Sequence, residues 1–117
     1  MKYWMMSIIV LLIFAGVGFA HPPTGVEMEF NNETKVLTVL VTHPVNKINK
    51  HFIDKIVVEL NDKEIVTQTF RTQGDGEGQE VMYVIVDAKA GDTIAVTGYC
   101  NVSGKKKASL TVEDQEE

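Results

Sequence analysis

Short runs in which apolar and polar residues alternate recur along residues 21–117, and each run is closed by turn-forming residues. In the first run, from Val26 to Phe30, every second residue is apolar, which is the pattern of a half-buried strand. No part of this region keeps a helical periodicity over a useful length. The pattern therefore predicts an all-β domain.

Seven strands follow from this pattern. They are predicted at residues 26–30, 35–42, 52–60, 63–71, 79–86, 93–100 and 105–112. Asn61 and Asp62 separate two of these runs and predict a two-residue hairpin turn. Seven short antiparallel strands in so short a stretch, with no linker and no repeat, predict an immunoglobulin-like β-sandwich.

Residues 1–20 differ in composition from the rest of the chain. Lys2 is their only charge, the middle from Ile8 to Phe14 is apolar, and the segment ends in Gly-Phe-Ala. These features predict a secretory signal peptide that is cleaved after Ala20, leaving the sandwich domain at residues 21–117. The alternative is an uncleaved membrane anchor, because a bilayer-spanning helix needs about 20 apolar residues. We therefore expect an exported protein, in the periplasm or outside the cell.

Charge and cysteine usage narrow the function classes. The chain has 11 basic and 16 acidic residues and a net charge of −5, which argues against nucleic acid as a partner. Cys100 is the single cysteine, so no internal disulfide can form. In an exported protein such a cysteine is a pairing site, a reactive thiol or a metal ligand. The oligomeric state stays open, a homo-oligomer included.

The predicted strand order brings the remaining candidate residues together. If each strand reverses the chain, three places share one end of the sandwich: the entry to the first strand, the loop after the second and the loop after the sixth. They contain His21, His43, His51 and Cys100, which are all the histidines and the only cysteine. Imidazoles with a thiolate suit iron, copper or zinc better than calcium or magnesium. The glycine-rich segment 72–78 is expected at the same end.

At these residues the chain resembles the iron-binding domain of superoxide reductases, the neelaredoxin and desulfoferrodoxin family. The matching segments are His-Pro-Pro at 21–23, His-Pro at 43–44, Lys-His-Phe-Ile at 50–53 and Tyr-Cys-Asn-Val-Ser-Gly at 99–104. The resemblance covers nearly all of residues 21–117. It departs from the family in three ways. Ser103 stands in place of a fourth histidine, Asn49 in place of a common glutamate, and the loop from His43 to His51 is longer by two residues.

The resemblance implies an iron centre that alternates between the ferrous and ferric states. His21, His43 and His51 would be its equatorial ligands and Cys100 its axial ligand, opposite an open position. It also implies reduction of superoxide to hydrogen peroxide with an electron from an external donor, which the sequence does not identify. Lys50 matches the lysine that attracts the anionic substrate in this family.

Two other functions are compatible with the sequence. Cleavage after Ala20 would make His21 the first residue, and its α-amine and imidazole could then chelate copper in a protein without catalytic activity. A metal-free sandwich that serves adhesion or assembly is the third reading. In each of these interpretations, the protein would be attached to a membrane only if the signal peptide were not cleaved.

Overall fold

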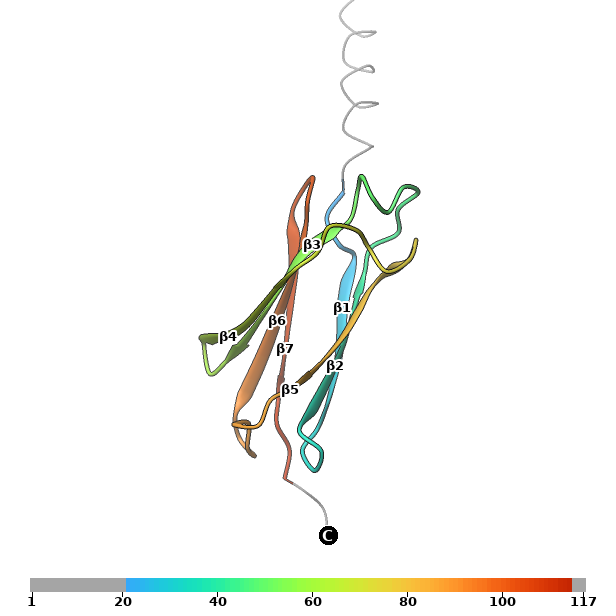
Figure 1. Ribbon diagram of the computed structural model, residues 1–117. Helices are drawn as coiled ribbons and strands as arrows, with labels where there is room; N and C mark the ends of the chain where they lie inside the picture. The colour runs from blue at the N-terminus through green and yellow to red at the C-terminus, as the bar shows by residue number, and fades with distance from the viewer. Residues whose placement is uncertain (1–20, 115–117) are drawn as a thin grey trace, which may run out of the picture.

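The computed structural model describes residues 21–114, which form seven β-strands (Figure 1). These are β1 (Gly25–Asn31), β2 (Val36–Thr42), β3 (Ile53–Leu60), β4 (Lys63–Thr69), β5 (Gly78–Val84), β6 (Thr93–Cys100) and β7 (Lys105–Thr111). The predicted all-β fold is confirmed. The predicted signal peptide at residues 1–20 lies outside the described residues. Within the described part of the chain, no helix has the length and apolar character needed to cross a membrane.

The strands form two antiparallel sheets that face each other. One sheet has the order β1-β2-β5 and the other the order β4-β3-β6-β7. Figure 1 shows the two layers side by side, and the pairing order makes β4 and β5 edge strands of their sheets. The arrangement is an immunoglobulin-like sandwich in which the fourth strand pairs with the third instead of joining the first sheet.

The hairpin between β3 and β4 forms as its turn residues predict. Asn61 and Asp62 have φ angles of 51° and 71°. A two-residue type I′ turn needs positive φ at both positions, which Asn and Asp tolerate better than most residues. The turn pairs Leu60 with Lys63 and so places β4 on the margin of the four-stranded sheet.

Alternate residues of the central strands form the core between the sheets. The fully buried side chains include Leu37, Val39, Val41, Ile56, Val58, Ile94 and Val96. Each such side chain stabilises the fold by about 2 kcal/mol through burial. A one-residue slip in pairing would turn a whole strand's apolar side chains outward, so this core also fixes the register. The loops at the ends of the strands are thereby held in place.

Four chain segments meet at one end of the sandwich, which we call the histidine end. They are the entry to β1 and the β2–β3, β4–β5 and β6–β7 connections, all at the top of Figure 1. Backbone hydrogen bonds join them: Gln73 N–H donates to Ile48 C=O at 3.1 Å and Asn101 N–H to Phe52 C=O at 3.0 Å. The predicted meeting of these segments at one end is confirmed.

Candidate metal centre

Two histidines flank the strands that reach the histidine end. His43 directly follows β2, is fully buried, and donates its backbone N–H to Glu77 C=O at 2.8 Å. Pro44 follows it and has no N–H with which to continue the ladder. His51 lies two residues before β3, and its N–H donates to Lys47 C=O at 3.0 Å, which closes a turn. The strand ends therefore fix both histidines at the same level of the sandwich.

The three histidine rings form a compact triangle. Ring centroids are 5.1 Å apart for His21 and His43, 4.9 Å for His21 and His51, and 4.7 Å for His43 and His51. One ring nitrogen from each lies within 4.8 Å of the other two. Two nitrogens that bind one ion at about 2.1 Å can be at most about 4.2 Å apart. A small inward movement would therefore bring all three into one coordination sphere.

His51 contributes a ring nitrogen without a partner. Its Nε2 is buried, and no hydrogen-bond partner exists for it among residues 21–114. Buried polar atoms are nearly always hydrogen-bonded, and an exception calls for an explanation such as an ion that the site is built to hold. A metal ion between the rings would supply the missing partner.

His21 differs from His51, because both of its ring nitrogens lie against backbone carbonyl oxygens. Its Nδ1 lies 3.0 Å from Pro22 C=O and its Nε2 lies 3.0 Å from Pro44 C=O. A neutral imidazole carries only one N–H, so only one of these contacts can be a hydrogen bond. The other nitrogen then points a lone pair at a carbonyl oxygen, and binding an ion through that nitrogen would replace this contact.

His43 is held by a residue that the sequence pattern did not single out. Its Nδ1 lies 2.8 Å from Oε1 of Gln73, a buried side chain in the β4–β5 loop. Its Nε2 lies 3.4 Å from His21 C=O. No motif marks Gln73, and a polar residue in a glycine-rich loop gives no sign of burial. Its role became visible only with the fold.

The environment of His51 predicts a pH dependence for the metal-free protein. Burial lowers its pKa from the ordinary value of 6.5, His43 and His21 lower it further, and the nearby backbone of His21 opposes them. The unfolded chain then binds this proton more readily than the folded chain. The contribution of His51 to the free energy of unfolding should therefore be fully present above about pH 6.5. It should be lost as the pH falls through the lower pKa that His51 has in the folded protein.

Thermal melts of the metal-free protein at a series of pH values from about 7.5 down to 5 check this prediction. The melting temperature should fall on acidification, and His51→Gln should flatten part of the fall. A His51→Gln profile parallel to the original one would contradict it.

Cys100 lies at the same end but outside the histidine group. It is the last residue of β6, pairs with Ile53 of β3, and is 9% exposed. Its Sγ accepts N–H groups from Val102 at 3.3 Å and Ser103 at 3.4 Å. The set of ligand atoms within 4.8 Å of one another comprises the three histidines and not this sulfur. Of the four predicted ligands, the three histidines thus lie together. The fourth, Cys100, is a buried thiol at the end of β6, the strand that pairs with β3.

Lys50 and Ser103 flank the group. Lys50 is exposed, and its carbonyl accepts Nδ2–H of Asn101, the residue after Cys100, at 3.0 Å. Its ammonium makes no ion pair with any described residue. Ser103 donates its backbone N–H to Cys100 Sγ at 3.4 Å. The loop that bears the thiol is therefore tied to the residue that precedes His51.

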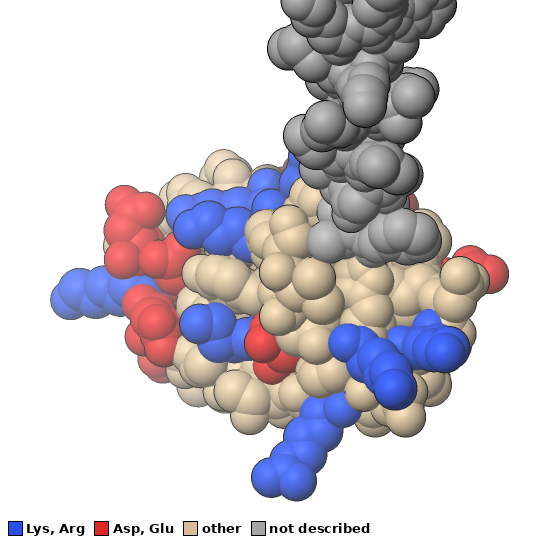
Figure 2. Space-filling model, turned by 90° about the horizontal axis from the view of Figure 1, so that it is seen from above, with Lys and Arg blue, Asp and Glu red and all other residues tan. Residues whose placement is uncertain are grey.

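The surface around the histidine end is rich in basic residues. Figure 2 views this end and shows Lys and Arg side chains projecting at several points of the rim. The exposed lysines of the connections and of the start of β7 are Lys47, Lys50, Lys105, Lys106 and Lys107. The whole chain has a net charge of −5, and the same end also carries Asp75 and Glu77 in the β4–β5 loop, so the lysines are interspersed with carboxylates. Lysines without an acidic partner within residues 21–114, such as Lys50, can attract small anions.

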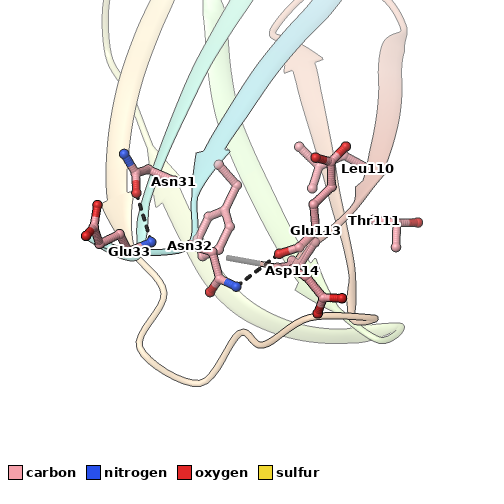
Figure 3. A pocket seen from close by; sticks show the side chains of 9 residues that line it. Asn31, Asn32, Glu33, Leu110, Thr111, Glu113 and Asp114 are labelled. Atoms are coloured by element: carbon pink, nitrogen blue, oxygen red, sulfur yellow. Dashed lines mark hydrogen bonds between the residues drawn. The ribbon is translucent and has the colours of Figure 1, made fainter. Parts of the chain in front are cut away.

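A hollow of about 430 Å³ lies at the opposite end, between the β1–β2 turn and the residues after β7 (Figure 3). Its polar side chains serve the local turns: Asn31 Oδ1 accepts Glu33 N–H at 2.8 Å, and Asn32 Nδ2 donates to Glu113 C=O at 3.0 Å. Its lining contains no histidine or cysteine, and its carboxylates are exposed. The candidate chemistry therefore lies at the histidine end.

Comparison of the chain with protein-family models, with curated proteins and with solved structures finds no match.

Proposed function

We propose that this protein is an exported iron protein of the superoxide reductase type. The observation that carries the proposal is the triangle of three imidazoles, in which His51 Nε2 is buried without a partner. Lys50 precedes His51, and the end of β6 carries the thiol of Cys100. These are the residue types that the resemblance predicts, in the predicted order along the chain.

His21, His43 and His51 would hold the iron through one ring nitrogen each. Cys100 would join them as a thiolate after a local adjustment, since its sulfur lies outside the group. Bound iron would supply a one-electron redox centre, to which a thiolate donates electron density. The N–H groups of Val102 and Ser103 point at the sulfur and would tune that donation.

The proposed reaction is a one-electron reduction. Superoxide gains one electron and two protons and becomes hydrogen peroxide, and the electron comes from an external donor. Lys50, with no acidic partner in the described part of the chain, would draw the substrate anion towards the histidine end. The surrounding lysines would extend this attraction, which added salt should weaken.

Metal analysis and absorption spectroscopy of anaerobically purified protein test this function. We expect iron in the purified protein and a thiolate-to-iron charge-transfer band on oxidation. Cys100→Ser should remove the band while the protein keeps its fold, because serine replaces the sulfur with little change in volume. Iron-loaded protein that consumes superoxide no faster than free iron would refute the proposal.

A copper-binding protein without catalysis is the second candidate, and one observation favours it. The ligand atoms that approach one another are all imidazole nitrogens, without the sulfur. If export leaves His21 as the first residue, its α-amine could join its imidazole at one copper ion. Mass spectrometry of the amino terminus decides whether that amine exists. Copper binding that survives Cys100→Ser, without bound iron, would favour this candidate over the first.

A further inference from the structure

We propose that Gln73 is the positioning residue of the centre, which fixes His43 so that Nε2 is its metal-binding nitrogen. The inference deepens the proposed metal site and rests on it for its functional meaning. It concerns a side chain that touches neither substrate nor metal. It assigns a definite tautomer to one imidazole, which can be measured without any metal present.

The orientation of the Gln73 amide follows from its neighbours. Nε2 lies 2.8 Å from His43 C=O and 2.9 Å from Asp75 C=O, and both of these groups can only accept. Oε1 lies 3.1 Å from the Ile53 N–H, which can only donate. A flipped amide would lose all three hydrogen bonds, so the oxygen must face Ile53 and the nitrogen must face the two carbonyls.

This orientation sets the tautomer of His43. The atom 2.8 Å from His43 Nδ1 is Gln73 Oε1, which has no hydrogen to donate. Nδ1 must therefore carry the proton, and in the neutral ring Nε2 is then the bare nitrogen. That nitrogen lies 3.4 Å from the His21 C=O, and His43 belongs to the group whose ligand atoms converge with those of His21 and His51. Metal-binding histidines in general are oriented by such a hydrogen bond from the ring nitrogen that does not bind the metal.

Gln73 also joins the strands that bear the ligands. Its side chain bonds the end of β2 at His43 and the start of β3 at Ile53, and its backbone N–H donates to Ile48 C=O in the β2–β3 loop. The same loop positions His51. With an exposed fraction of 1%, the side chain has no water as an alternative partner. Through this side chain, and through the Glu77 C=O that accepts the His43 N–H, the β4–β5 loop therefore supports the centre.

Nitrogen-15 NMR of the metal-free, otherwise unaltered protein at about pH 8 tests the assignment, because imidazoles are then neutral. Long-range proton–nitrogen correlations distinguish a protonated from a bare ring nitrogen. We expect His43 to carry its proton on Nδ1. A proton found on Nε2 overturns the proposal, and this measurement needs no variant that must fold.

Gln73→Met keeps the length of the side chain and removes its polar atoms. We expect a mixture of His43 tautomers and an affinity for Zn²⁺, measured by competition with a chelator, that falls roughly 10–100-fold. Gln79→Met is the matched control, since Gln79 bonds Gly74 N–H in the same loop and no histidine. Equal Zn²⁺ affinities for the two variants would overturn the proposal.

The outcomes separate this inference from the proposed function. Absence of superoxide reduction, or a metal other than iron, leaves the His43 tautomer and the Zn²⁺ comparison unaffected. Conversely, an active iron protein with His43 protonated on Nε2 would retain the function and refute the role of Gln73.

Discussion

His51→Ala is expected to remove most of the stabilisation that a bound metal ion gives this protein. At a free metal concentration of 100 times Kd, binding to the folded state alone stabilises it by about 2.7 kcal/mol. For a domain of this size, that raises the melting temperature by roughly 10–20 °C. Loss of an outer-shell partner already costs up to about 100-fold in affinity, so loss of a ligand should cost at least as much. The same metal concentration should then raise the melting temperature of the variant by only about 2–3 °C.

Thermal melts with and without metal measure this difference within each variant, so a change in intrinsic stability cancels. Fe(II) without oxygen and Zn²⁺ as a redox-inert probe are the ions to compare. Lys50→Ala is the matched control, because Lys50 adjoins His51 and is exposed without an ion pair among the described residues. It should keep the full metal-induced shift. A full shift in His51→Ala would show that the three rings do not share an ion.

The sequence predicted which residues meet because strand alternation carries that information. In runs such as 35–42, apolar residues recur at every second position, and turns such as Asn61-Asp62 end the runs. Because each strand runs antiparallel to the one before it, every loop is then assigned to one end of the sandwich. The burial of Leu37 and Val39 fixes the register of β2, and Pro44 prevents the ladder from continuing, so His43 lies at the end of the strand. The prediction that the histidines converge therefore needed no knowledge of side-chain packing.

The details of the centre depend on packing that no periodicity encodes. Gln73 lies in a loop between strands, where backbone conformation is set by contacts with Ile48 and His43 from other loops. Cys100 has the inward parity of β6, which the sequence gives, but its separation from the rings depends on how the β6–β7 turn folds around its sulfur. Orientation and distance at this scale are properties of the assembled loops.

Gly78→Ala should be the most disruptive single-atom addition near the centre. Gly78 begins β5 and pairs with Thr42 of β2, and a Cβ placed on it would overlap the carbonyl oxygen of Val41. Backbone cannot rotate away as a side chain can, so β2 and β5 would have to separate. Overpacking of this kind costs about 3 kcal/mol, which lowers the melting temperature by roughly 12–24 °C.

The effect should reach the metal centre through the backbone. Glu77, the neighbour of Gly78, accepts the His43 N–H at 2.8 Å, so separation of the strands displaces His43 and weakens metal binding as well as the fold. Gly74→Ala, in the adjoining β4–β5 loop, is the control, because its Cβ would find only the Gln79 side chain at an ordinary 3.5 Å. It should change stability by less than about 0.5 kcal/mol. Equal melting temperatures for the two variants would mean that β2 and β5 can separate at Gly78 without strain, and that His43 is not fixed by this contact.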